Sequence, residues 1–300
     1  MKYKKTISLL VIIVAILSIF STSFAIFSNQ GQGEYEYKSL YGESVSIYGK
    51  GLYEHDSVSM AAQAIAQDYV TLFLGVPLLL LSFYLYRKGL LKGSLLQTGT
   101  LGYFLYTYAS YSFLSMYNSM FLVYVALMSA SFFAFTLMMM SYDINSLPLF
   151  FSEKMPVKFL GGFLLFVSFV FGMMWTGKLG FPLMNHTLPP GDLQHYTTFV
   201  IQALDLGFVV PVGLLAGVLL IMRKPFGYLL APVIIIKEIT LLTAMTSMIF
   251  LQIKAGVQIG GLLIWSIILF NLLVIYCMIL VLKNIKETKE PTSSSGMSLN

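Results

Sequence analysis

Eight long apolar runs constrain this chain of 300 residues more than any other feature, and polar segments separate them. A run of roughly 18 or more apolar residues with few charges is long enough to cross the hydrocarbon of a bilayer as a helix. Only 10% of the residues are charged, whereas a soluble domain carries about a quarter. The sequence therefore predicts an all-α polytopic transmembrane bundle of about eight spans, with the lipid bilayer as its partner. The runs are 6–27, 66–86, 94–113, 118–140, 157–177, 198–222, 226–252 and 257–282.

The basic residues predict how the spans are oriented. Most of the 18 lysines and arginines lie in the two ends of the chain and in the joints at 87–92, 154–158 and 223–224. Positive residues concentrate in cytoplasmic loops, so both termini and these joints are expected in the cytoplasm. The basic residues form neither one face nor one tail, which argues against nucleic-acid binding.

Four parts follow from this pattern. Residues 1–27 form a first transmembrane helix, although Ser23-Phe24-Ala25 also fits signal-peptide cleavage. The charge pattern fits both alternatives, and we favour the uncut helix. Residues 28–66 form an acidic extracytoplasmic segment, 66–282 the remaining seven helices, and 283–300 a polar, serine-rich and disordered cytoplasmic tail.

The extracytoplasmic segment carries two local signals. Val45 and Ile47 alternate with polar residues before Gly49-Lys50-Gly51, which predicts a short hairpin. Asp56 or Ser57 is placed to cap a helix that runs directly into the second span.

Two stretches of the chain resemble each other. Each has an aspartate, a Val-Pro pair, a leucine-rich half-helix, a basic turn and a further apolar run. The bundle can therefore consist of two parallel four-helix halves, with a binding site between them. Shared membrane composition explains the similarity equally well, so both interpretations stay open. The matching positions are Asp68, Val76-Pro77 and Arg87-Lys88 in the first stretch, and Asp205, Val210-Pro211 and Arg223-Lys224 in the second.

Few ionisable residues fall at membrane depth, and such residues are candidates for function because their burial is costly. Asp68 and Asp205 lie in the outer parts of the second and sixth spans, each ahead of a proline. A proline frees a backbone carbonyl that can join a polar site. A polar core that fixes helix register and a transport site are both compatible with these aspartates.

Lys237 and Glu238 lie near the bilayer midplane, about 16–18 Å along their helix from Phe226. As neighbours on a helix they project about 100° apart and are expected not to pair well with each other, so each needs a partner on another helix or must be neutral. Asp205 is the partner expected for Lys237. A structural polar core explains the two residues slightly better than a proton relay does.

The third run carries several tyrosines, and two of them, Tyr103 and Tyr106, are candidates to line a hydrated cavity. No nucleotide-binding, metalloprotease or Ser/His/Asp pattern occurs, so an enzyme is the less favoured class and no cofactor is expected. The outer-side residues His55, Met60, Met184, His186 and His195 could hold a soft metal, although scattered loop residues are the commoner explanation.

Several strings in the chain resemble a family of bacterial multi-pass membrane proteins to which no activity is assigned. The resemblance covers about residues 45–250 and implies a bacterial cytoplasmic membrane. It implies nothing about mechanism. The strings are Tyr48-Gly49-Lys50-Gly51-Leu52-Tyr53 with Asp56, Gln67-Asp68-Tyr69-Val70-Thr71-Leu72 leading to Pro77, and Asp205-Leu206-Gly207 leading to Pro211.

Two functions remain. The first is a small-solute or ion transporter with an outer-leaflet site between the second and sixth helices. The second is a non-transporting sensor or assembly partner that acts through residues 28–66. We favour the transporter, with substrate-binding residues Asp68, Asp205, Lys237, Glu238, Tyr103 and Tyr106.

Overall fold

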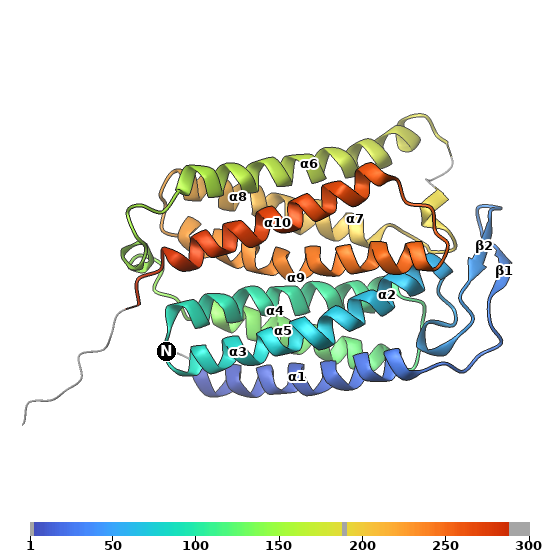
Figure 1. Ribbon diagram of the computed structural model, residues 1–300, viewed down its shortest axis with the longest axis horizontal. Helices are drawn as coiled ribbons and strands as arrows, with labels where there is room; N and C mark the ends of the chain where they lie inside the picture. The colour runs from blue at the N-terminus through green and yellow to red at the C-terminus, as the bar shows by residue number, and fades with distance from the viewer. Residues whose placement is uncertain (1–2, 188–190, 288–300) are drawn as a thin grey trace, which may run out of the picture.

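The structure, a computed structural model, describes residues 3–187 and 191–287 as a bundle of long helices that run side by side (Figure 1). A two-stranded hairpin stands at one end. The helices are α1 Lys4–Phe27, α2 Val58–Val70, α3 Val76–Arg87, α4 Leu91–Leu114, α5 Phe121–Met139, α6 Val157–Met184, α7 Val200–Leu204, α8 Val210–Ile221, α9 Gly227–Lys254 and α10 Gly261–Lys283. The strands are β1 Tyr35–Lys38 and β2 Ser44–Ile47.

The two ends of the bundle differ in charge. The start of α1, the turns that join α3 to α4 and α8 to α9, the start of α6 and the end of α10 all lie at one end (Figure 1). We call this the basic end, because Lys4, Arg87, Lys158, Arg223 and Lys283 lie there. The opposite end, which carries β1 and β2, is the hairpin end.

Within the described residues, seven helical stretches are long and apolar enough to cross a membrane. The chain is thus an integral membrane protein with an all-α bundle. The sequence predicts about eight spans, and the stretch outside the seven is α4, which has 24 residues but is richer in threonine and tyrosine. Most residues of α4 are buried inside the bundle, so its polar side chains face protein.

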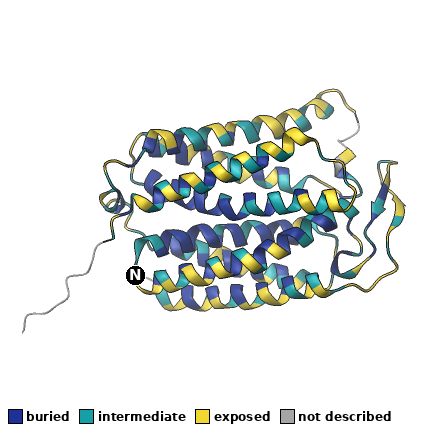
Figure 2. Cartoon of the chain, viewed as in Figure 1, coloured by how far each residue is buried: buried dark blue, intermediate teal, exposed yellow. Residues whose placement is uncertain are grey.

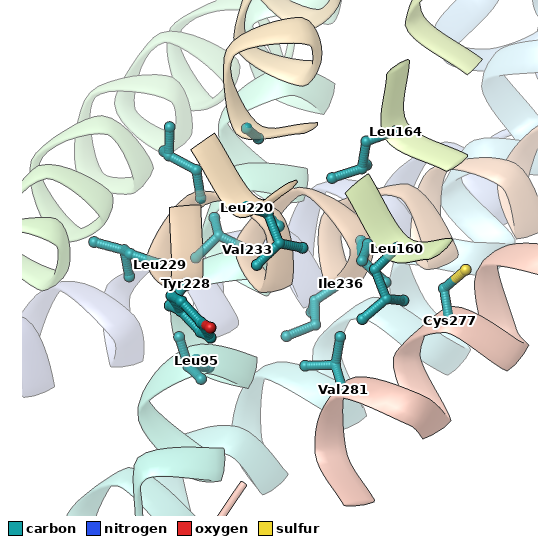
Figure 3. Packing of buried hydrophobic residues seen from close by; sticks show 14 of the residues in the cluster. Leu95, Leu160, Leu164, Leu220, Tyr228, Leu229, Val233, Ile236, Cys277 and Val281 are labelled. Atoms are coloured by element: carbon teal, nitrogen blue, oxygen red, sulfur yellow. The ribbon is translucent and has the colours of Figure 1, made fainter. Parts of the chain in front are cut away.

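Burial follows the position of each helix. α4 and α9 pack against each other in the centre and are largely buried, whereas α1, α6 and α10 expose apolar side chains on their outer faces (Figure 2). Exposed apolar surface of this extent is expected where lipid surrounds a protein. At the basic end, leucine, isoleucine and valine side chains from α4, α6, α8, α9 and α10 fill the interior (Figure 3).

Two of the spans contain a π-helical turn. Residues Thr71–Gly75 join α2 to α3, and residues Asp205–Val209 join α7 to α8. Each turn is followed directly by a Val-Pro pair at the start of the next helix. The prolines therefore do not break the spans. Proline lacks the N–H that an α-helix would use, and a π turn wraps one extra residue into the helix, often at a functional site.

Helices α6 and α8 pack closely through glycine. A Cβ atom on Gly217 would lie 2.7 Å from the carbonyl oxygen of Gly161 and 2.8 Å from Cγ of Leu165. Small residues allow backbones to approach in this way inside membranes. By contrast, a Cβ atom on Gly177 near the other end of α6 would meet nothing within 4 Å.

The hairpin that the sequence predicts is present, but its turn lies elsewhere. β1 and β2 pair antiparallel, and the loop between them is residues 39–43. Gly49 and Gly51, expected to form the turn, have φ of 69° and 58° and lie against the backbones of Gly33 and Ser28. A side chain at either position would collide with those backbones, so these close approaches require glycine.

The helix expected to run into the second span is confirmed. It begins at Val58, and the hydroxyl of Ser57 accepts a hydrogen bond from the backbone N–H of Met60 at 3.2 Å. Ser57 is therefore the cap, and Asp56 is free for another role.

The end of the described chain is fastened to the bundle. Both carboxylate oxygens of Glu287 accept hydrogen bonds at 2.9 Å, from the N–H groups of Leu91 and Lys92 at the start of α4. Lys286 N–H donates to the carbonyl of Phe150 at 2.7 Å. Residues 284–287, which are expected in the tail, thus contact the bundle. Residues 288–300 lie outside the described residues.

Candidate functional site

A cavity of about 440 Å³ lies in the half of the bundle nearer the hairpin end. α2, α4, α6, α9 and α10 form its walls together with the π turn at 205–209. Asp56 and Tyr196 line the end of the cavity nearest the hairpin, which we call its outer end. Ile234 and Val274 line its inner end near the middle of the bundle. Cavities of this size can enclose a small organic molecule.

The cavity has one polar side and one apolar side. Amide and hydroxyl groups on α2 and α4 provide much of the polar side, namely Gln63, Gln67, Thr107 and Ser110. The apolar side comes from α6, α9 and α10, namely Phe163, Val167, Phe171, Met245, Phe270 and Val274. The rings of Phe171 on α6 and Phe270 on α10 lie 6.5 Å apart, centroid to centroid, and are tilted by 60°. We call the three phenylalanines of this side, Phe163, Phe171 and Phe270, the phenylalanine wall.

Asp205 is the acidic residue at the inner part of the cavity. It opens the π turn and is only 8% exposed. Its Oδ1 accepts a hydrogen bond from the hydroxyl of Tyr106 at 2.7 Å, and its Oδ2 accepts one from the indole N–H of Trp175 at 2.9 Å. Two neutral donors on α4 and α6 therefore hold the carboxylate. Among the described residues, no lysine, arginine or histidine forms an ion pair with it.

The expectation that Lys237 and Glu238 cannot pair with each other is wrong. Lys237 Nζ lies 2.8 Å from Glu238 Oε1. The 100° between neighbouring positions is overcome because both side chains are long enough to bend toward each other. Lys237 Nζ also lies 4.4 Å from the ring centroid of Tyr106. Lys237 is thus linked to Asp205 through Tyr106 and forms no ion pair with it, and Glu238 lines the cavity.

Asp68 belongs to a different cluster. It is 2% exposed, and the cavity-lining residues of the described chain do not include it. The hydroxyl of Tyr53 donates to its Oδ2 at 2.6 Å, and that of Tyr111 donates to its Oδ1 at 3.2 Å. Tyr108 and Tyr124 pack around Tyr111. The two aspartates that the sequence treats as equivalent therefore lie in different surroundings, one in a packed tyrosine cluster and one beside open space.

Tyr103 and Tyr106 also lie in different surroundings. Tyr106 lines the cavity, whereas Tyr103 is fully buried beside it. The amide nitrogen of Gln67 donates to the Tyr103 hydroxyl at 2.6 Å, and the hydroxyl of Thr71 lies 2.7 Å from the same oxygen. Gln67 and Tyr111 line the cavity while also contacting the cluster, so they connect the two sites.

Three loops contact one another at the outer end of the cavity. Asp56 Oδ1 accepts hydrogen bonds from the Tyr196 hydroxyl at 2.8 Å and from the N–H of Met116 at 3.2 Å. The hydroxyl of Ser57 donates to the side-chain oxygen of Gln194. We call these four side chains, Asp56, Ser57, Gln194 and Tyr196, the outer latch.

Asp56 is 3% exposed, and its Oδ2 has no hydrogen-bond partner among the described residues. Burial raises the pKa of this carboxyl group to about 6, although the hydrogen bonds from Tyr196 and Met116 partly oppose the increase. His195, on the loop that carries Gln194 and Tyr196, contacts the carbonyl of His55 at 3.0 Å through its Nε2. Burial lowers the pKa of His195.

No signal in the sequence pointed to several of these residues. Trp175 and Tyr196 sit in no pattern that predicts a site, and Asp56 is predicted from the residues only as a possible helix cap, although it belongs to the same resemblance string as Tyr53. Tyr53 lies in one of the strings that carry the family resemblance, which was the one available signal. The structure groups no three His, Cys, Asp or Glu side chains as possible metal ligands within the described residues.

Searches with protein-family models, among curated proteins and among solved structures find no match to this chain. The function therefore has to be argued from the cavity and its surroundings.

Proposed function

We propose that this protein is a carrier for small solutes in a bacterial cytoplasmic membrane, with its binding site in the cavity beside Asp205. The observation that carries the proposal is a 440 Å³ cavity inside a membrane bundle, lined by a buried carboxylate without an ion pair. Ionisable groups at membrane depth that face a cavity commonly mark a transport path. The bacterial location rests on the family resemblance alone.

The proposed carrier spans the membrane eight times, with α4 as the third span and both termini in the cytoplasm. The clustering of basic residues at one end of the bundle supports this orientation. The burial of α4 supports its assignment as a span, because a helix surrounded by other helices need not be apolar on its own.

The bundle is also proposed to consist of two parallel halves, α1–α5 and α6–α10. Three features recur in the same order and support it. A π turn precedes a Val-Pro pair, the following half-helix ends in a basic turn, and the next helix lies in the buried centre. Asp68 and Asp205 occupy related places, and each binds a tyrosine of α4.

In this proposal the structure corresponds to a state closed toward the cytoplasm. The interior at the basic end is filled by apolar side chains such as Leu95, Leu160, Leu220 and Ile236 (Figure 3). The cavity begins beyond them, toward the hairpin end. Because the outer latch is also formed here, transport requires one state in which the latch opens and another in which this packing opens while the latch stays closed.

Cysteine labelling tests the proposal without knowledge of the solute. Ser168 lines the cavity about 16 Å along α6 from its start, and a serine-to-cysteine change is small. In a Cys277→Ala background, which removes the one native cysteine, Ser168→Cys is treated with a membrane-impermeant methanethiosulfonate. A carrier predicts modification in both right-side-out and inside-out vesicles. Modification from the outer side alone, or from neither side, contradicts the proposal.

A sensor or assembly role for residues 28–66 is the second candidate. It is favoured by the exposed side chains of Tyr37 and Leu40 on the hairpin, which are available to a partner outside the cell. This role predicts that Ser168→Cys reacts from the outer side alone. It also predicts that replacing residues 35–47 with a glycine-serine linker abolishes function while Asp205→Asn does not.

A further inference from the structure

Resting on the proposed carrier function, we infer that the solute is an organic ammonium ion. Its positive charge pairs with Asp205, and its apolar body packs against the phenylalanine wall formed by α6 and α10.

The charges around the cavity favour a cation. Glu238 is neutralised by Lys237 at 2.8 Å, whereas Asp205 is held only by Tyr106 and Trp175, which are uncharged donors. The described lining of the cavity includes no lysine, arginine or histidine. The charge of Lys237 acts on Asp205 only at longer range, without a direct ion pair. A buried carboxylate without an ion pair is destabilising, and a cationic ligand supplies the missing partner. A second acidic residue, Asp56, lines the outer end of the cavity, and its Oδ2 has no hydrogen-bond partner among the described residues.

The walls favour an organic cation over a metal ion. Calcium and magnesium need about six oxygen ligands, and the described residues group no three acidic, histidine or cysteine side chains together. The apolar side of the cavity would gain nothing from a hydrated ion, but it can bury hydrocarbon. Aromatic rings also attract ammonium groups. In this structure Lys178 Nζ already lies 5.4 Å from the centroid of the Trp175 ring.

The chain provides its own reporter for binding. It has two tryptophans. Trp175 lines the cavity and donates to Asp205, whereas Trp265 on α10 is 72% exposed. In the full-length Trp265→Phe variant, Trp175 is therefore the single indole, and its fluorescence reports on the site.

Three probes of similar shape separate charge from hydrophobicity. The purified variant in detergent is titrated with phenyltrimethylammonium, with its uncharged isostere tert-butylbenzene, and with the anion benzenesulfonate. We expect the ammonium to change Trp175 fluorescence at a concentration about tenfold or more below that needed for the isostere. Benzenesulfonate is expected to have no saturable effect. The cavity keeps all its native residues in this comparison, because the one substitution, Trp265→Phe, lies at an exposed position outside the cavity lining.

A matched pair of substitutions assigns the preference to Asp205. Asp205→Asn is expected to lower the affinity for phenyltrimethylammonium about tenfold or more and to leave the affinity for tert-butylbenzene within about twofold. Asp143→Asn, at an exposed position between α5 and α6, is expected to change neither.

Two results overturn the inference. One is equal or tighter binding of tert-butylbenzene, which would indicate that Asp205 is protonated and that the ligand is neutral. The other is an ammonium preference that survives in Asp205→Asn. Either result leaves the carrier function standing if Ser168→Cys is labelled from both sides, because that labelling involves no ligand. Conversely, ammonium binding with labelling from the outer side alone would support a receptor for the same cation.

Discussion

Replacing Asp56 with asparagine tests the outer latch through its dependence on pH. Asp56 lies outside the membrane-spanning segments, and burial raises its pKa from 3.8 to about 6. The folded protein therefore binds this proton more tightly than the unfolded chain does. Ionisation of Asp56 destabilises the fold, and the stability contributed by this group falls as the pH rises from about 4 to about 6.

The size of the effect follows from the two pKa values. A difference of about two pKa units corresponds to about 3 kcal/mol at neutral pH. Asparagine keeps an oxygen that can accept from Tyr196 and Met116, but its amide nitrogen would replace Oδ2, which has no partner among the described residues. A buried donor without an acceptor costs about 1–2 kcal/mol. We expect Asp56→Asn to be more stable than the wild type by about 1–2 kcal/mol at pH 7.5, and no more stable at pH 4.

The assay is unfolding of both proteins in the same detergent, followed by tryptophan fluorescence between pH 4 and pH 8. The difference between the two proteins is the quantity of interest. His195 titrates in the opposite sense, because its lowered pKa removes stability as the pH falls, but it is present in both proteins and cancels. A difference that does not change with pH, or a wild type that is more stable at pH 7.5, would refute the reasoning.

Three further predictions concern the packing of α6 against α8, the contact of Glu287 with the start of α4, and the first helix. Gly217→Ala should destabilise the α6–α8 contact by about 1–3 kcal/mol, whereas Gly177→Ala should be neutral or slightly stabilising, as measured by thermal unfolding. Glu287→Gln should lower the free energy of unfolding by about 1 kcal/mol at low salt, because it removes a negative charge from the start of α4. The exposed Glu153→Gln should not, and equal effects would show that Glu287 does not cap α4. Mass spectrometry of the intact purified protein should give a mass that includes the first helix, since the buried face of this helix packs into the bundle. The mass of a chain that starts after Ala25 would show cleavage.

The spans were predictable because the bilayer imposes a length and the charges mark the ends. Runs such as 226–252 agree with their helices to within a few residues. The end of α6 was not predictable from its apolar run, since the helix continues through Lys178 and Pro182 to Met184. The partner of Glu287 could not be found either, because the start of α4 is far away in the sequence.

The site was only half predictable for a geometric reason. Counting residues from a basic turn gives the depth of Asp68 and of Asp205, and the count treats them alike. The face on which each aspartate lies depends on how its helix is wound, and each span carries a π turn that changes the winding locally. Asp205 opens its turn, whereas Asp68 precedes the turn at 71–75 by three residues. This difference separates an aspartate beside the cavity from one in the tyrosine cluster.

The carboxylate of Asp205, which forms no ion pair, has an electrical consequence for the proposed carrier. When a monovalent cation binds, the site becomes neutral, and the membrane voltage exerts little force on the occupied form. The empty form keeps one negative charge, for which a full crossing of the field is worth about 2.3 kcal/mol per 100 mV. A negative cytoplasm repels that charge. The voltage would therefore favour the state in which the unoccupied site is open to the outside, where it can bind the next cation.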